Sequence, residues 1–153
     1  MLSIAVCNRQ NKLRIDAARL KKVARAVLRD AGVLGGSLSI AIVDDAAIRE
    51  LNKKYLDHDY ATDVLSFPLS RNAGRLEGEV VASAETAARV AARFGWKPAD
   101  ELLLYVVHGA LHLVGYDDRT VKARAQMQAA QRRYLAALGL EVRDKPKRPG
   151  GKR

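Results

Sequence analysis

Cysteine is nearly absent from this chain of 153 residues, in which Cys7 stands alone. A lone cysteine cannot form an internal disulfide, which argues against a disulfide-stabilised secreted domain. It predicts a reducing, cytoplasmic setting and no disulfide-linked partner. Long apolar runs are also missing, since no segment approaches the ~18 uninterrupted apolar residues of a membrane helix. The N-terminal segment MLSIAVCNRQ has no basic stretch before its short apolar run, so we expect neither a secretory signal nor a membrane partner.

Acidic residues are also scarce. Asp and Glu number 17 against 27 Lys and Arg, which leaves a formal net charge of +10. Six of the basic residues fall in the C-terminal segment EVRDKPKRPGGKR, and the others are spread along the chain. A basic surface attracts RNA, DNA or anionic membranes, and it also keeps a protein soluble. Charge alone leaves these interpretations open.

Apolar residues make up 48% of the chain, enough for the core of one compact domain. We assign residues 1–144 to that single domain. The segment 145–153 is rich in Pro, Gly and Lys and is predicted to be a basic disordered tail. There is no internal repeat and no sign of a second domain, and no feature of the sequence indicates an oligomeric state.

Hydrophobic periodicity predicts an α+β fold, in which helices pack on a small mixed four-stranded sheet. The alternating segments predict strands at 1–7, 37–43, 63–67 and 79–83. Pro68 is expected to end the third strand, and a turn is expected over 70–78. Helical spacing and capping residues predict helices from Asp16 to Gly32, from Asp44 to about Tyr55, and at 84–94, 98–114 and 120–138.

Two histidines interrupt the apolar segment ELLLYVVHGALHLV, which is typical of a buried helix. His108 and His112 are four residues apart, so they lie on one helical face and can share a metal ion. Gly115 follows where the helix should end, and Asp118 comes three residues later. The sequence therefore predicts a metal site at the end of a buried helix, with these two histidines and Asp118 as ligands.

The spacing is that of the extended zincin motif H-E-x-x-H-x-x-G-x-x-H, with two substitutions. Gly109 replaces the glutamate that acts as general base in zincin proteases, which argues against peptide hydrolysis. Asp118 replaces the third histidine. An alternative role for Asp118 is to cap the next helix, and Asp117 is the alternative carboxylate ligand. Three protein ligands leave a fourth position open, as in catalytic sites. On a basic chain, this site favours phosphodiester chemistry in RNA.

Three segments in the same order resemble the YbeY-type endoribonucleases, a family of bacterial rRNA maturation factors. The segment HGALHLVGYDD that begins at His108 is similar to the family signature HGxLHLxGYDH. A second block of the family has the residues LN, then Tyr, then TDVLSFP. This chain matches it with Leu51-Asn52, Tyr55 and the segment ATDVLSFP at 61–68. The segment GEVVAS at 78–83 is similar to its GDI-x-IS strand.

The resemblance implies a zinc-dependent, single-strand-specific endoribonuclease, with His108, His112 and Asp118 as the zinc ligands and the two histidines as catalytic residues. It places Thr62, Asp63, Ser66 and Glu79 at the substrate, although turn and strand-edge roles are equally open for the first three. It further implies 16S rRNA 3′-end processing and ribosome quality control, with ribosomal RNA and the small ribosomal subunit as partners.

Two departures from the family pattern bear on the chemistry. Asp118 in place of histidine lowers the net charge of a zinc site from +2 to +1 and favours some tolerance for harder ions such as Mn²⁺. Leu56 stands where the family usually has an arginine, a natural phosphate ligand. These changes motivate an alternative hypothesis, a non-catalytic rRNA-binding assembly factor with a structural metal. A metalloprotease and a two-His-one-carboxylate iron oxygenase are further alternatives.

Overall fold

The structure is a computed structural model in which residues 1–141 are described. Within that range the elements follow the order β1 (Leu2–Asn8), α1 (Ala17–Asp30), β2 (Gly35–Val43), α2 (Asp45–Leu56), β3 (Val64–Asn72), β4 (Arg75–Ser83), α3 (Ala84–Phe94), α4 (Pro98–Leu113) and α5 (Val121–Ala136). The basic tail predicted at 145–153 lies outside the described residues, so it stays a prediction.

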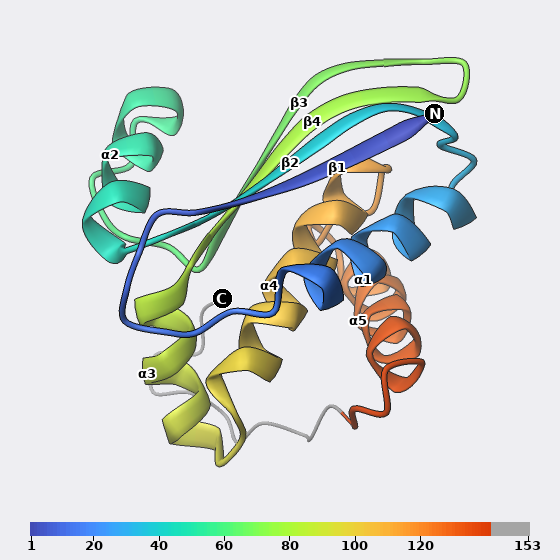
Figure 1. Cartoon of the computed structure of the whole chain (residues 1–153). Helices are drawn as coiled ribbons and strands as arrows, with labels where there is room; N and C mark the ends of the chain where they lie inside the picture. Colours follow the sequence, from blue (N-terminus) through green and yellow to red (C-terminus); the bar gives the residue numbers. More distant parts are fainter. Residues whose placement is uncertain (142–153) are drawn as a thin grey trace.

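The strands form one mixed sheet in the order β1-β2-β4-β3 (Figure 1). β1 runs parallel to β2 and β2 runs parallel to β4, whereas β3 pairs antiparallel with β4. β1 and β3 are therefore the edge strands. This arrangement confirms the predicted α+β fold with a small mixed four-stranded sheet.

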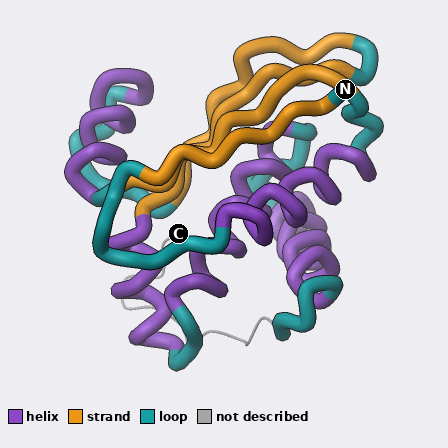
Figure 2. The backbone as a smooth tube through the Cα atoms, viewed as in Figure 1, coloured by secondary structure: helices purple, strands orange, loops and turns teal. Residues whose placement is uncertain are grey.

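Helices α1, α4 and α5 lie together on one side of the sheet, below it in Figure 1, and Figure 2 shows the strands as a single layer above them. Side chains from these helices form the main core with the inward-facing residues of the sheet, among them Ile4, Leu38 and Val80. α4 contacts α1, α3, α5, β3 and β4, and all but two of its residues from Asp100 to Leu113 are buried. This central position explains why its sequence is apolar on nearly every face.

α2 packs on the opposite side of the sheet through a smaller core. That core contains Val43, Ile48, Leu65 and Val81. Val81 is the neighbour of Val80 on β4, and successive strand residues point to opposite faces. The two cores are therefore separated by the sheet, and β3 contributes to both.

Asp45 joins α2 to β4 and α3 at one end of the sheet. Its carboxylate accepts hydrogen bonds from Ser83 Oγ and Thr86 Oγ1, both at 2.6 Å, and from the Arg89 guanidinium at 3.0 Å. Burial by itself raises the pKa of Asp45, but these three hydrogen bonds outweigh burial and hold the pKa below its ordinary value. The ionised form of Asp45 therefore stabilises this junction.

The predicted boundaries of the β3–β4 hairpin were wrong. β3 continues through Pro68 to Asn72, and β4 begins at Arg75, so most of the turn expected at 70–78 is strand. Pro68 is tolerated because β3 is an edge strand, where an absent N–H need not interrupt the ladder, and the register shifts between Pro68 and Ser70. The turn itself is Ala73-Gly74, both with positive φ, as in the tight hairpins that suit twisted strands.

The helix boundaries follow the capping residues of the sequence. Asp16 caps α1 and Asp44 caps α2, each by accepting a backbone N–H, and Pro98 occupies the first turn of α4. Cys7 is exposed, at the end of β1. Among the described helices, none is long and apolar enough to span a membrane.

Candidate metal centre

His108 and His112 occupy the same face of α4, one turn apart. Their Nε2 atoms face each other at 3.1 Å, and the ring centroids are 4.7 Å apart with the ring planes inclined by 73°. Both side chains are half-buried, whereas most of the residues around them on α4 are buried. The helix thus presents two imidazole nitrogens at its one accessible face.

Asp118 reaches the histidines because the chain turns sharply after α4. Gly115 has φ +106°, a conformation that L side chains rarely adopt, and its N–H donates to the carbonyl of His112 at 3.2 Å. The turn brings the carboxylate of Asp118 back to the ring nitrogens. The three candidate ligand atoms of His108, His112 and Asp118 lie within 4.8 Å of one another.

The sequence left two alternatives open here, namely that Asp118 caps the next helix and that Asp117 is the ligand. The geometry argues against both. Thr120, not Asp118, caps α5, since its hydroxyl accepts the N–H of Ala123 at 3.0 Å. Asp117 accepts the N–H of Arg119 at 3.1 Å and lies outside the three-residue group. Asp118 is therefore the carboxylate that is placed for ligation.

The donor set fits a divalent ion of the zinc type. Two nitrogens bound to a tetrahedral zinc ion at about 2.0–2.1 Å lie roughly 3.3 Å apart, close to the observed 3.1 Å between the Nε2 atoms. Two imidazoles and one carboxylate are also a ligand set that other transition metals accept. Three protein ligands leave positions for water or substrate.

Gln131 on α5 is a residue that the sequence analysis missed. Its Oε1 lies 2.7 Å from Nδ1 of His108. A carbonyl oxygen can only accept, so this contact favours the tautomer that has the proton on Nδ1, which leaves the lone pair of Nε2 for a metal ion. The only signal in the sequence is that Gln131, an amide residue, follows the apolar Met127 by one helical turn. That pattern is too common to identify a role for Gln131.

The histidines and Asp118 line an open cleft of about 470 Å³ between β3 and α4. Three of the predicted substrate residues, Thr62, Asp63 and Ser66, line the same cleft. Ser66 Oγ donates to the carbonyl of Gly109 at 2.9 Å, and Asp63 accepts the N–H of Val64 at 2.8 Å. The structure therefore brings these residues together with the metal group, and it also gives two of them local structural roles.

Gly109 marks the closest approach of α4 to the sheet. A Cβ atom built at this position would lie 2.7 Å from Val80 Cγ1 and 3.1 Å from Ser66 Oγ. Val80 is fully buried, so an added side chain would force α4 or the sheet to shift. Glycine at the position of the zincin glutamate therefore suits this close packing, and a larger side chain would be strained here.

Two residues singled out from the sequence lie away from the cleft. Glu79 falls between Gly78 and Val80, whose Cα atoms face α4, so its side chain projects from the other face of the sheet. There it is near enough to Arg9 to contribute to the raised pKa of that guanidinium, after the larger effect of Cys7. Leu56, 48% exposed at the end of α2, lines neither cavity that contains His108.

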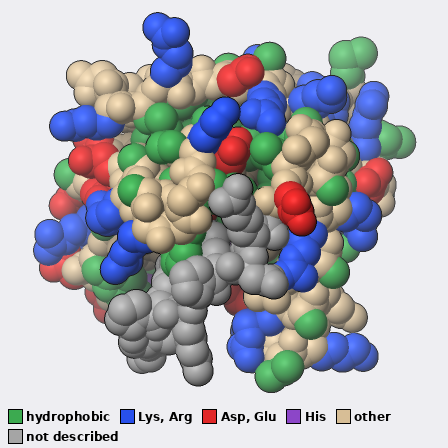
Figure 3. All heavy atoms as spheres, turned by 90° about the horizontal axis from the view of Figure 1, so that it is seen from below, with side chains coloured by type: hydrophobic (Ala, Val, Ile, Leu, Met, Phe, Trp, Pro, Cys, Tyr) green, Lys and Arg blue, Asp and Glu red, His purple; other side chains and the backbone are tan. Residues whose placement is uncertain are grey.

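The positive charge is dispersed on the helical side of the molecule. Figure 3, which views this side from below, shows Lys and Arg side chains scattered around the face and interspersed with acidic ones. The basic residues that are spread along the sequence thus form no single patch on the part of this face that Figure 3 shows.

Comparison with known proteins is consistent with this geometry. A model of the family described as "Endoribonuclease YbeY" matches residues 5–139. A Rhodopirellula baltica protein of that description is 43% identical over 133 residues, which cover 84% of this chain and 68% of the relative. One from Geobacter metallireducens is 36% identical over 143 residues, covering 90% of this chain and 95% of the relative.

A solved structure shows the same fold. The solution structure of a Thermotoga maritima protein has a TM-score of 0.60 and 23% sequence identity, and the match covers 91% of this chain and 92% of that protein.

Proposed function

Because the chain belongs to the YbeY endoribonuclease family, we propose that it is a zinc-dependent endoribonuclease that cleaves single-stranded RNA. Its substrate is ribosomal RNA, and its role is the processing of the 16S rRNA 3′ end and ribosome quality control on the small ribosomal subunit, in the cytoplasm. The observation that carries this proposal is the convergence of His108, His112 and Asp118 in an open cleft.

The ion would be held by His108, His112 and Asp118. When bound, a divalent ion of this type polarises a phosphate oxygen or makes water a stronger nucleophile. The chain's own contribution is orientation: Gln131 keeps the proton of His108 on Nδ1, and α4 holds both rings on rigid backbone. Thr62 and Ser66 supply hydroxyl groups along the β3 side of the cleft, where single-stranded RNA can lie.

Gly109 distinguishes this chemistry from that of a protease. Peptide hydrolysis by zincins depends on a glutamate beside the first histidine, and this chain has a glycine in contact with Val80 at that position. The iron oxygenases use a similar ligand set, but membership of an endoribonuclease family favours RNA as the substrate.

The proposal is tested by measuring metal content and RNA cleavage on the same preparations. Wild type, His112→Ala, Asp118→Ala and the control Asp117→Asn are analysed by mass spectrometry and then incubated with labelled RNA that carries the 16S 3′ end, both single-stranded and annealed to its complement. We expect about one zinc per chain in wild type and the control, cleavage of the single strand only, and loss of metal and cleavage in both ligand variants. Cleavage that persists without metal contradicts the proposal.

Leu56 keeps one alternative function open, a non-catalytic rRNA-binding factor. Its exposed apolar side chain cannot bind a phosphate, although the end of α2 is otherwise basic, with Lys53 and Lys54 in the last turn. The variant Leu56→Arg separates the two functions. If wild type binds rRNA without cleaving it and Leu56→Arg cleaves, the binding-factor function is correct for the natural chain.

A further inference from the structure

A second cavity, of about 90 Å³, opens on the α5 side of the metal group. It shares Asp63, Val64, His108 and Asp118 with the larger cleft, so the two are continuous around the ligands. Its α5 wall presents three polar side chains at helical spacing: Arg124, Gln128 and Gln131. Gln131 is engaged with His108, which leaves the first two facing the cavity.

Arg124 is anchored beside the metal group. Its Nη1 donates to the backbone carbonyl of Asp118 at 3.1 Å, which fixes the guanidinium next to a candidate ligand. Within residues 1–141, no carboxylate lies close enough to form an ion pair with it. A guanidinium has five N–H donors in a planar fork, so most of them stay available to an anion.

The balance of charge around this cavity favours an anion only when a divalent metal ion is bound. Asp63 and Asp118 oppose an anion, whereas Arg124 and the N-terminus of α5, which has no acidic residue in its first turn, attract one. A divalent ion on the three ligands would offset both carboxylates. The cavity has room for several water molecules, hence for phosphate oxygens, but it is far below the ~300 Å³ typical of a pocket for a whole small molecule.

We propose that Arg124 binds a phosphate group of the RNA backbone beside the metal group, with the Gln128 amide as a second donor on the same face of α5. This inference rests on the proposed function. It places the RNA backbone on the α5 side of the cleft, opposite Thr62 and Ser66 on the β3 side. Arginine matches a phosphate with two parallel hydrogen bonds, which lysine cannot reproduce.

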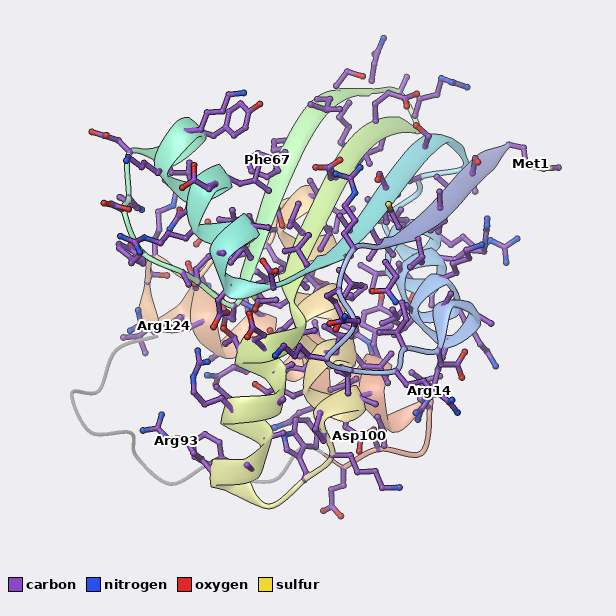
Figure 4. All side chains as sticks on the ribbon, turned by 60° about the vertical axis from the view of Figure 1, so that its left-hand side comes forward. Met1, Arg14, Phe67, Arg93, Asp100 and Arg124 are labelled. Atoms are coloured by element: carbon purple, nitrogen blue, oxygen red, sulfur yellow. The ribbon has the colours of Figure 1, made fainter. Side chains whose placement is uncertain are left out.

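The test measures binding separately from cleavage. The probe is a single-stranded 2′-O-methyl oligonucleotide of the 16S 3′-end sequence, added to zinc-loaded protein, and the dissociation constant is measured by fluorescence anisotropy over a salt series. The variants are Arg124→Gln and Arg124→Lys. The matched control is Arg14→Gln, which makes the same charge change on an exposed residue far from Arg124 (Figure 4).

We expect Arg124→Gln to weaken binding about tenfold or more and to flatten the salt slope by about 0.7. Arg124→Lys should keep the slope and lose part of the affinity, and Arg14→Gln should change the affinity less than about twofold. Zinc content and melting temperature are measured for each variant, so that loss of metal or of fold is seen directly. Because the Arg124 side chain is exposed, we expect the zinc content and the melting temperature to stay at the wild-type values.

The proposal is overturned if Arg124→Gln and Arg14→Gln weaken binding equally, since the effect would then be general charge. It is also overturned if Arg124→Gln leaves both the affinity and the KM for cleavable RNA unchanged, while wild type cleaves normally. Failure of the proposed function has a different signature: wild type binds the oligonucleotide through Arg124 and cleaves no unmodified RNA.

Discussion

The amide oxygen of Gln131 and Nδ1 of His108 are 2.7 Å apart, which links α5 to the metal-binding face of α4. Such a partner fixes the ring orientation and the protonated nitrogen of a histidine ligand, and its loss typically weakens metal binding 10–100-fold, roughly 1.4–2.7 kcal/mol. Gln131 is thus a positioning residue, which acts through the ring of His108.

We expect Gln131→Leu to weaken zinc binding by about that 10–100-fold factor, whereas Gln131→Glu restores an acceptor and keeps the affinity near that of wild type. The measurement is competition with a chromophoric chelator. Gln126→Leu is the matched control, because Gln126 is exposed on α5 and lines a different cavity. Equal affinities of Gln131→Leu and this control would show that the hydrogen bond is unimportant for binding.

Removing the metal should lower the melting temperature of wild type. An ion that binds only the folded state adds about 2.7 kcal/mol of stability when its free concentration is 100 times the dissociation constant. Adding excess chelator should therefore lower the melting temperature of wild type and leave that of His112→Ala unchanged. Thermal unfolding followed by circular dichroism checks this expectation, and an equal shift in both proteins would contradict it.

Gly109→Ala tests the close contact between α4 and the sheet. Alanine usually stabilises a helix by up to ~1 kcal/mol relative to glycine, but overpacking a core costs about 1–3 kcal/mol. Because the new Cβ would lie 2.7 Å from Val80, we expect net destabilisation of about 1 kcal/mol or more. In a Val80→Ala background the space is available, so the same substitution should stabilise. Urea unfolding of the four proteins measures both effects, and a destabilisation that is equal in the two backgrounds would contradict the packing argument.

Asp45 should make the stability of the fold depend on acid pH. Its pKa is lowered in the folded state, so its contribution is complete above the unfolded-state value of about 3.9 and is lost as the pH falls through the lower folded-state value. Asp45→Asn should therefore be less stable than wild type near pH 7, and the difference should shrink in acid.

Urea unfolding at several pH values measures this difference. The control is Asp57→Asn at the end of α2, where Asn tolerates the left-handed backbone of Asp57 and removes the same charge. A difference between Asp45→Asn and wild type that does not change with pH would mean that ionisation of Asp45 is not coupled to folding.

Periodicity and capping signals were sufficient to predict most of the fold. The strands and helices are local consequences of alternation, N-caps such as Asp16 and Asp44, and glycine at helix ends, so they were found near their observed positions. The β3–β4 hairpin was misjudged because Pro68 is compatible with a strand only at a sheet edge. Strand order is a tertiary property that the local sequence does not contain.

The metal group was predictable for a related reason. His108 and His112 belong to one helix, and the glycine turn makes Asp118 nearly local, so spacing made all three candidates; only the structure separates Asp118 from the competing Asp117. Gln131 and Arg124 lie on a different helix, and their approach to the group depends on how α5 packs against α4. Glu79 shows the converse, since a motif match does not reveal which face of the sheet a side chain occupies.

The contact at Gly109 also bears on how this fold can evolve. A single substitution that introduced the zincin glutamate would bring its Cβ into steric conflict with Val80 and Ser66. Smaller side chains at Val80 and Ser66 would relieve that conflict, so the glutamate is more readily accepted after such changes than before them. These two activities are separated by an evolutionary barrier of steric origin, although their metal ligands share one spacing.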